Sequence, residues 1–332
     1  AYLPVEKHTR RQKDRHGISV CNMADTAKCM ADGMHDANHT VGKRRPGQEA
    51  CISHRQPRLV RISWADCLLQ IRSVEQLQRI LSYLRKTGNE YFLLGNGTNL
   101  LVSDRGYQGV VLQIGGGLSG ISIEGEKIRV QAGALLSKTA KAAMDAGLAG
   151  MEFASGIPGS VGGGIVMNAG AYDGEMKQIV EQVTVLNEDG ELMELDCDTM
   201  EFGYRTSVIR NRPFVVVEAL LSLQKGDPEQ ILAKMADFAQ RRRAKQPLEY
   251  PSAGSTFKRP EGYFAGKLIM DSGMRGRRVG GAQVSEKHCG FIVNTGNATS
   301  EDVAELMIEV QERVKERFGV MLEPEIVKLG KF

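Results

Sequence analysis

The stretch PSAGSTFKRP, residues 251–260, places two serines and two cations between two prolines. Ser255 and Lys258 lie three residues apart, and no apolar stripe or helical period accompanies them. A serine hydroxyl is a very weak acid, so it can donate a proton only where a cation or a polarised hydrogen-bond network supports it. The stretch is therefore either part of an active site or a surface turn whose serine binds its own backbone.

Two glycine-rich segments, LLGNGTNLLVSD (93–104) and GIPGSVGGGIVMNAGAYDG (156–174), offer a second kind of chemistry. Such loops let the backbone approach a ligand closely and point successive N–H groups at an anion such as a pyrophosphate. Neither is a dinucleotide-binding fingerprint, because Leu100 stands where the third glycine belongs. Each loop alone could be a tight turn between strands. Two loops with no acidic residue at their centres favour an anionic cofactor.

Composition excludes several classes of protein. The 332 residues are 42% hydrophobic, enough for a sizeable core, while a net charge of +3 and a single Trp do not favour nucleic acid. Six cysteines without a CxxC pair indicate free thiols in a reducing compartment and no metal site. The longest apolar run, FVVVEALLSL, is too short to span a membrane, and the charged N-terminal stretch lacks a signal region. We therefore expect a cytoplasmic protein without nucleic-acid or membrane partners.

Local patterns predict the elements that must position these segments. A capping box of Ser73 and Gln76, an apolar stripe and Gly88 predict a helix over 73–88. A second helix is predicted over 135–147. Strands are predicted at 91–95, 100–104, 109–114 and 214–223, and hairpins over 121–133, turning at Glu124–Lys127, and over 180–195, turning at Asp189–Gly190.

The pattern changes near residue 225, where we place a domain boundary. Asp227 as cap and Pro228 in the first helical position begin a helix. Its predicted buried face consists of Ile231, Leu232, Met235 and Phe238. The last helix is predicted from Ser300 to near Gly319. The fold class is therefore α+β in two parts.

Six segments together carry a resemblance to a known family. They are GNGTNLLVSD, GIPGSVGGGIVMNAGAY, FGYRTS, PLEYPSAGSTFKRP, GGAQVSEKHCGFIVN and LEPEIVKLG, in this order over roughly residues 67–332. They resemble the UDP-N-acetylenolpyruvoylglucosamine reductases. The resemblance implies an FAD-binding domain of the vanillyl-alcohol-oxidase type over 67–225 and a smaller α+β substrate-binding domain over 226–332. The uninterrupted PLEYPSAGSTFKRP implies the subtype that lacks an extra tyrosine-bearing loop.

The activity that this resemblance implies is reduction of UDP-N-acetyl-3-O-(1-carboxyvinyl)-glucosamine to UDP-N-acetylmuramate in peptidoglycan precursor synthesis. It implies NADPH as co-substrate and a non-covalent FAD, and we expect a monomer or a weak dimer. One alternative is an oxygen-using FAD-dependent sugar or alcohol oxidase of the same flavin fold. Many such oxidases tether the flavin through His or Cys, and neither glycine loop contains one. Another is a non-catalytic nucleotide-sugar binding protein, which would show no flavin absorption.

The resemblance also assigns catalytic roles. It makes Ser255 the proton donor, with Lys258 as the local cation, and Arg205 of FGYRTS the residue that holds the developing carboxylate-enolate. A planar guanidinium suits this task, whereas a surface arginine at a strand end is the plain alternative. Glu323 and Glu325 flank Pro324 in an extended stretch and point the same way, so the pattern alone does not choose between them. The family motif selects Glu325 as the acidic partner.

The remaining site residues follow from motif position. The resemblance places FAD against Gly95, Asn96, Gly97, Thr98, Asn99, Leu100, Gly156, Ile157, Pro158, Gly159, Ser160, Gly162, Gly163, Asn168 and Gly170. It places substrate against Tyr172, Tyr204, Lys258, Arg259 and His288. From its residue type alone His288 is a packed or substrate-facing histidine. The basic run 241–243 is explained by helix-dipole complementarity and solvation, with phosphate binding as the second choice.

The sequence departs from the family at one place. A Gly-Gly-Pro-Ala segment usually lies beside the flavin, but here the chain reads VRISWAD, with Ser63 and Trp64 in place of small residues and proline. Only Ala65 and Asp66 agree with the family. Residues 1–66 also carry scattered charges and no sustained period. We expect them to be an atypical segment, either non-native through a reading-frame error or disordered.

Overall fold

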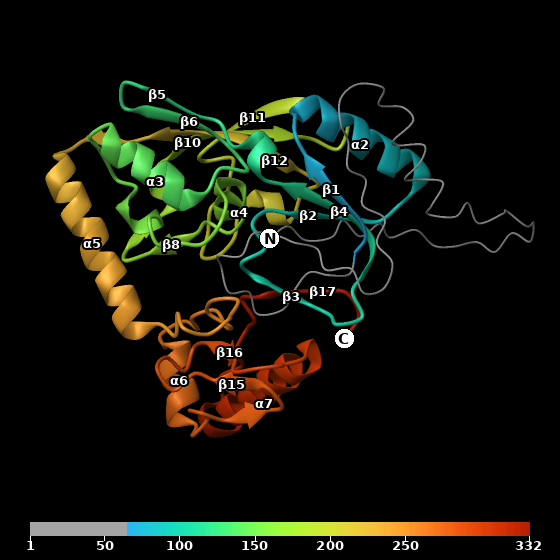
Figure 1. Ribbon diagram of the computed structural model, residues 1–332, viewed down its shortest axis with the longest axis vertical. Helices are drawn as coiled ribbons and strands as arrows, with labels where there is room; N and C mark the ends of the chain where they lie inside the picture. The colour runs from blue at the N-terminus through green and yellow to red at the C-terminus, as the bar shows by residue number, and fades with distance from the viewer. Residues whose placement is uncertain (1–64) are drawn as a thin grey trace, which may run out of the picture.

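The computed structural model describes residues 65–332 (Figure 1). The expected atypical segment falls outside this range except for Ala65 and Asp66, which begin the first strand. A parallel three-stranded sheet in the order β1-β4-β2 opens the fold, with helix α2 following β1. The bounds are β1 Ala65–Ile71, α2 Val74–Thr87, β2 Tyr91–Leu94 and β4 Tyr107–Ile114.

Helix α2 forms for the reasons that its sequence predicts. Ser73 Oγ accepts the Gln76 N–H at 3.1 Å, and Gly88 ends the helix in the left-handed region at φ 69°. The Gln76 side chain, however, accepts the N–H of Arg72 at 2.7 Å and does not close the expected capping box on Ser73. The predicted start and end of the helix are therefore confirmed, while the reciprocal bond is displaced by one residue.

A five-stranded antiparallel sheet in the order β11-β10-β12-β6-β5 forms the second layer. Both predicted hairpins are confirmed, with Gly125 and Gly190 at positive φ in their turns. Helix α4, which belongs to the second glycine-rich segment, packs against β6 and β12. The bounds are β5 Ile121–Glu124, β6 Lys127–Gln131, α3 Leu136–Asp145, α4 Val161–Val166, β10 Val180–Leu186, β11 Leu192–Asp196 and β12 Val215–Ser222.

Helix α5 (Pro228–Lys245) connects the two parts of the molecule, as Figure 1 shows at the left of the view. Asp227 Oδ1 accepts the Glu229 N–H at 2.9 Å, which confirms the predicted cap. The predicted buried face was partly wrong, because Leu232 is 55% exposed while Ile231 and Phe238 are buried. The helix packs against α3 and the first part through one narrow face. Leu232 lies about 100° around the helix from Ile231 and so falls outside it.

The C-terminal part has its own apolar core, built around helix α7 and a small antiparallel sheet in the order β14-β15-β16. The predicted bounds of α7 are confirmed, since Gly319 ends it at φ 70°. Thr299 and Asp302 cap its start reciprocally, which the sequence analysis did not predict. The bounds are α6 Ala265–Asp271, β14 Arg278–Val279, β15 Ala282–Val284, β16 Ile292–Asn294 and α7 Ser300–Phe318.

The end of the chain returns to the first part. Strand β17 (Val327–Leu329) pairs in parallel with β3 (Leu100–Val102), which directly follows the first glycine loop (Figure 1). Asp104, just beyond β3, accepts the N–H and the hydroxyl of Ser300 with Oδ2, at 2.6 and 2.8 Å. Strand pairing and this cap together hold the two parts in register.

The predicted domain boundary can be compared with the pairing and packing near residue 225. Strand β13 (Gln224–Lys225) pairs with β7 (Leu148–Ala149), α5 packs on the first part, and the second core, apart from Leu101, begins only at Ala253. The boundary near residue 225 therefore stays a prediction.

Cys67, Cys197 and Cys289 are free thiols. None of the helices between residues 65 and 332 is long and apolar enough to cross a bilayer.

The contact between Asp104 and α7 predicts a measurable stability effect. Asp104→Ala removes the acceptor for the first N–H of α7, which should lower the free energy of unfolding by about 0.5–2 kcal/mol. Urea denaturation of the full chain measures it. Arg105→Ala is the control, because the Arg105 side chain is 74% exposed and lies 3.6 Å from Glu301, so little should change. Equal effects of the two variants would contradict the capping role.

Candidate active site

A cavity of about 650 Å³ lies between the two parts, lined by both glycine-rich loops, the end of α5, residues of the 252–255 stretch and Glu325. The two loops lie against each other in its lining. A Cβ atom added to Gly95 would lie 2.6 Å from Ser160 Oγ, and one added to Gly159 would lie 3.8 Å from Thr98 Oγ1. The loops, about 60 residues apart in sequence, therefore build one wall that presents backbone rather than bulky side chains.

Ser255 reaches this cavity because its segment pairs with the chain around Glu325. Phe257 and Pro324 form an antiparallel bridge, and the Glu325 N–H donates to the Thr256 carbonyl at 2.9 Å. Ser255 is exposed in the cavity, and its hydroxyl makes no hydrogen bond with residues 65–332. The serine that binds its own turn is Ser252, whose Oγ accepts the Gly254 N–H at 3.5 Å. The plain turn explanation thus applies to Ser252.

Arg205 and Glu325 form a partly buried ion pair in the same cavity. Arg205 Nε donates to Glu325 Oε1 at 3.0 Å, and its Nη2 donates to the Gly170 carbonyl at 3.1 Å. The two side chains are only 21% and 13% exposed, so Arg205 is not a surface arginine at a strand end. Glu323 is 68% exposed and binds Lys258. Burial therefore distinguishes the two glutamates, which the sequence pattern alone does not.

The electrostatics of the site differ from group to group. Burial raises the pKa of the Glu325 carboxyl, and the cations Arg205, Lys258 and Arg210 oppose that rise. Burial lowers the pKa of His288, which favours a neutral imidazole. His288 Nδ1 accepts the Gly290 N–H at 3.1 Å, and its ring meets Phe291 edge-on. His288 is thus a packed, neutral histidine at the cavity wall.

The other residues predicted for substrate divide into two groups. Tyr172 lines the cavity, stacks on Phe238 at 4.3 Å and donates its hydroxyl to the Phe238 carbonyl. Tyr204, Lys258 and Arg259 lie outside the lining. Tyr204 is half exposed and its hydroxyl accepts the Arg259 N–H at 3.0 Å, while the Arg259 guanidinium lies 3.9 Å from the centre of the Phe264 ring.

The predicted cofactor residues are brought together with two exceptions. Gly162 and Asn168 lie outside the cavity lining. Asn168 is fully buried, and its side chain donates to the Gly203 carbonyl at 3.0 Å and accepts the Lys177 N–H at 2.9 Å. The cavity is lined by the other thirteen: Gly95, Asn96, Gly97, Thr98, Asn99, Leu100, Gly156, Ile157, Pro158, Gly159, Ser160, Gly163 and Gly170.

The structure adds cations that the sequence interpretation set aside. Arg241, Arg242 and Lys245, in the last turns of α5, line the cavity. Burial lowers the pKa of Arg242, and within the described part of the chain it has no carboxylate within 4 Å. Its Nη1 would lie 3.2 Å from a Cβ on Gly156. The basic run 241–243 gave no periodic signal for this, because only the long-range packing of α5 turns Arg242 toward the glycine loop.

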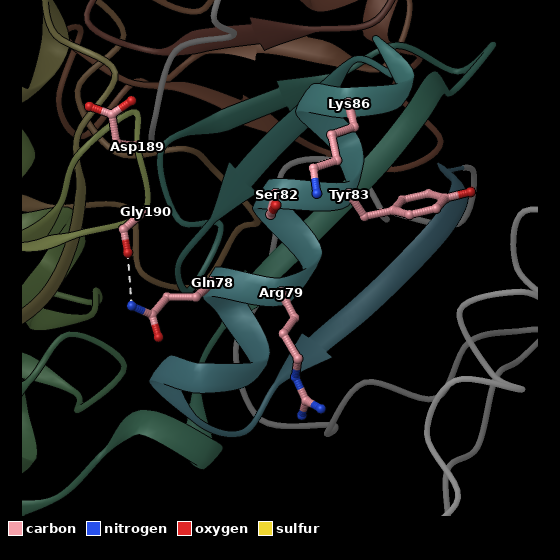
Figure 2. Close-up of a pocket in the computed structure, with 7 residues that line it drawn as sticks. All are labelled: Gln78, Arg79, Ser82, Tyr83, Lys86, Asp189 and Gly190. Atoms are coloured by element: carbon pink, nitrogen blue, oxygen red, sulfur yellow. Dashed lines mark hydrogen bonds between the residues drawn. The ribbon is translucent and has the colours of Figure 1, made fainter.

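A second cavity of about 400 Å³ lies on the outer face of α2 against the β10–β11 turn (Figure 2). Gln78 Nε2 donates to the Gly190 carbonyl at 2.8 Å across it. Figure 2 shows Arg79 and Tyr83 directed away from Asp189, so its polar groups do not converge on one point. This cavity contains none of the residues predicted for chemistry, and the first cavity is the candidate active site.

Comparison with known proteins agrees with this geometry. Residues 65–196 match the FAD binding domain family, and residues 246–329 match the C-terminal domain of UDP-N-acetylenolpyruvoylglucosamine reductase. The chain belongs to the UDP-N-acetylenolpyruvoylglucosamine reductase family. It is 52% identical over 266 residues to that reductase from Caldanaerobacter subterraneus subsp. tengcongensis, covering 80% of this chain and 88% of the relative. Because both parts of the chain match domains of this reductase, the comparisons favour a reductase over a flavin oxidase or a non-catalytic binding protein.

Two further proteins are similar. The reductase of Clostridioides difficile strain 630 is 47% identical over 266 residues, covering 80% of this chain and 88% of the relative. The crystal structure of the reductase from Thermus caldophilus has a TM-score of 0.68 at 38% identity, covering 79% of this chain and 92% of that one. The mixed fold, with an FAD binding domain before the family's C-terminal domain, is confirmed.

The cavity fits FAD, the cofactor of this family. Its glycine-rich wall lets a ligand approach the backbone closely, and Arg242 supplies a positive charge that no carboxylate of residues 65–332 neutralises. Neither glycine loop contains a His or Cys that could form a covalent link. The donor set therefore suits a non-covalent, anionic ligand.

The close approach of Gly95 to Ser160 predicts an effect on flavin binding. In Gly95→Ala the new Cβ would lie 2.6 Å from Ser160 Oγ, so the Ser160 side chain, which caps α4 by accepting the Gly163 N–H, must shift. Overpacking of this kind costs about 1–3 kcal/mol, which corresponds to roughly 10- to 100-fold weaker FAD binding. Fluorescence titration of FAD into flavin-free protein measures the Kd, and acid denaturation of a separate FAD-loaded sample shows whether the flavin is released.

Gly116→Ala is the matched control, because nothing lies within 4 Å of its added Cβ and its backbone is not in the left-handed region. Its Kd should stay unchanged. An unchanged Kd for Gly95→Ala would show that this wall does not hold the cofactor. Flavin that stays with the acid precipitate would show a covalent link.

Proposed function

We propose that Ser255, Arg205 and Glu325 are the catalytic residues of this chain. The chain is an FAD-containing reductase that converts UDP-N-acetyl-3-O-(1-carboxyvinyl)-glucosamine to UDP-N-acetylmuramate with NADPH, in peptidoglycan precursor synthesis. The observation that supports the three residues is their convergence on one cavity. The Arg205–Glu325 pair and the unbonded Ser255 hydroxyl line it together with the glycine loops.

Reduction of an enol ether requires a hydride at one carbon and a proton at its neighbour. FAD, when bound, supplies the hydride after taking it from NADPH. The chain itself must bind the carboxyvinyl group, stabilise charge that develops on its carboxylate, and deliver the proton. Arg205 suits the second task, because a partly buried guanidinium stabilises developing negative charge strongly.

Ser255 suits proton delivery, since its hydroxyl is exposed in the cavity and has no partner in the described structure. Glu325 fixes the orientation of Arg205 through the 3.0 Å bond from Nε. Because Glu325 accepts through this bond, the other edge of the guanidinium, with Nη2 on the Gly170 carbonyl, stays directed along the cavity wall. Lys258 contributes positive charge close to Glu325.

Binding roles follow the same geometry. We assign FAD to the two glycine loops over 95–100 and 156–163 with Gly170, and substrate to Tyr172 and His288 in the cavity, with Tyr204, Lys258 and Arg259 beside it. We keep the division into an FAD-binding domain, 67–225, and a substrate domain, 226–332, as part of the proposal. Two apolar cores support the presence of two domains, one within residues 71–223 and the other, apart from Leu101, within 253–326. Helix α5 would then contribute cations to both ligands.

Three finer assignments are also part of the proposal. The subtype without the extra tyrosine-bearing loop is supported by the direct run from α5 at Lys245 to the paired segment at Phe257. A cytoplasmic location is supported by the free thiols of Cys67, Cys197 and Cys289. We propose a monomer or weak dimer, which sedimentation of the full chain would test.

Ser255→Ala tests proton delivery. Transfer from NADPH to FAD does not involve this hydroxyl and should continue at its normal rate. Oxidation of the reduced flavin by the carboxyvinyl substrate needs the proton and should slow by roughly 10²- to 10⁴-fold. Stopped-flow absorption of the flavin follows the two half-reactions separately. Ser272→Ala, which changes a hydroxyl bound to the Ile269 carbonyl in the same part of the chain, is the control. No slowing of the second half-reaction would return Ser255 to an ordinary loop residue.

Arg205→Lys tests the guanidinium. Lysine keeps the charge but cannot bind both Glu325 and the Gly170 carbonyl with a planar fork. The second half-reaction should fall by about 10²- to 10³-fold, while FAD content and the urea midpoint stay near their normal values. Stopped flow and denaturation measure these quantities. Unchanged turnover would contradict a catalytic role for Arg205.

A further inference from the structure

Arg205 occupies an unusual backbone conformation. Its φ is 56°, in the left-handed region that a non-glycine residue adopts at a cost of about 1 kcal/mol or more. It lies in a tight turn closed by two hydrogen bonds between Gly203 and Thr206, of 3.1 and 3.3 Å. Such strain persists only where surrounding contacts determine the conformation. The contacts that hold this turn therefore decide where the Arg205 side chain points.

The first residue of the turn is held by Asn168. This fully buried side chain donates to the Gly203 carbonyl at 3.0 Å and is itself fixed by the Lys177 N–H at 2.9 Å. Asn168 thus connects the end of the second glycine segment to the turn. The Arg205 carbonyl, at the other end of the turn, has a different partner.

Arg210 holds that far end. Its Nη1 donates to the Arg205 carbonyl at 3.0 Å, reaching back over five residues. It belongs to the short helix η4 (Val208–Arg210), which is anchored at its start by two bonds: Ser207 Oγ donates to the Val166 carbonyl and the Val208 N–H to the Met200 carbonyl. The Arg210 side chain therefore extends from a short helix whose first residues are bonded to the surrounding structure.

We propose that Arg210 is a positioning residue for the reductase reaction, holding the strained Arg205 backbone so that the Arg205 guanidinium faces Glu325 and the substrate. This inference rests on the catalytic role proposed for Arg205. Without the bond from Arg210, the Arg205 peptide can rotate out of the left-handed region, and its side chain then swings away from Glu325. Misplacement of a catalytic group by about 1 Å can cost roughly 10²-fold in rate.

The charge of Arg210 supplies an independent readout. The charged groups around the Glu325 carboxyl are Arg205, Lys258 and Arg210, all of which lower its pKa against the rise that burial causes. Removing the Arg210 charge should move the titration of Glu325 to higher pH, because one of the cations that favour the carboxylate is gone. Arg210→Lys keeps this charge, so it separates the electrostatic effect on Glu325 from the loss of the hydrogen bond to the Arg205 carbonyl.

Arg210→Met in the FAD-loaded full chain tests the proposal, with Arg210→Lys to restore charge. Arg210→Met should slow the substrate half-reaction by roughly 10²-fold, with normal flavin reduction by NADPH and normal FAD content. The limb of its pH profile that reports Glu325 should shift to higher pH. Arg210→Lys should leave that limb in place and recover part of the rate.

The matched control is Arg212→Met, two residues away, since Arg212 is exposed and makes no side-chain hydrogen bond or ion pair in the described range. If Arg210→Met behaves like Arg212→Met, the proposal is wrong. Equal slowing of both half-reactions, or loss of FAD, would also overturn it, because Arg210 would then support the fold alone. If Arg205→Lys itself leaves the substrate half-reaction unchanged, the proposed catalytic site fails first.

Discussion

The parallel pairing of β17 with β3 is the contact on which the active site depends. It brings the last residues of the chain back to the first glycine loop, more than 220 positions earlier. Asn99 of that loop donates to the Glu325 carbonyl at 3.0 Å and accepts the Val327 N–H with its own carbonyl at 3.0 Å. The acidic partner is therefore fixed to the loop that forms the wall of the cofactor cavity. Its position does not depend on the α5 connection alone.

From Glu325 the constraint passes to Ser255 through the backbone. The Glu325 N–H binds the Thr256 carbonyl, and Lys258 binds back to the Glu323 carbonyl, so the two segments share one antiparallel register. A one-residue slip would exchange the faces on which their side chains lie. Because these links use main-chain groups, the side chains of Ser255 and Glu325 remain available for chemistry. Arg205 is positioned separately, by a strained turn whose ends are bound by Asn168 and Arg210.

The sequence predicted most accurately the helix ends and turns, which are determined by local interactions. The ends of α2 and α7 follow from a capping hydroxyl and a glycine in the left-handed region, which need no knowledge of the rest of the fold. Hairpin turns at Gly125 and Gly190 are equally local. Leu232 was placed wrongly because its exposure depends on which narrow face of α5 meets the first part.

Within the site, the motifs predicted which residue types are present. No local pattern in the sequence indicates which of the distant residues come into contact. Arg242 was set aside for the same reason, because the packing of α5 against the glycine loop has no signature in the run of three arginines. Asn168 lies within a glycine-rich motif yet binds the Arg205 turn, since its neighbours bury it away from the cavity.

The charge distribution connects the two halves of the cavity. Around Glu325, three cations surround one carboxyl whose burial raises its pKa, and along α5 Arg242 has no acidic partner in the range 65–332. Partly buried positive charge without a counter-charge is unfavourable until an anion binds. The substrate carries a carboxylate on its enol ether and a diphosphate in its nucleotide, and FAD carries a second diphosphate. The excess of cations in the lining of the cavity is thus complementary to its ligands, and the Arg205–Glu325 pair keeps Arg205 correctly oriented until the substrate carboxylate arrives.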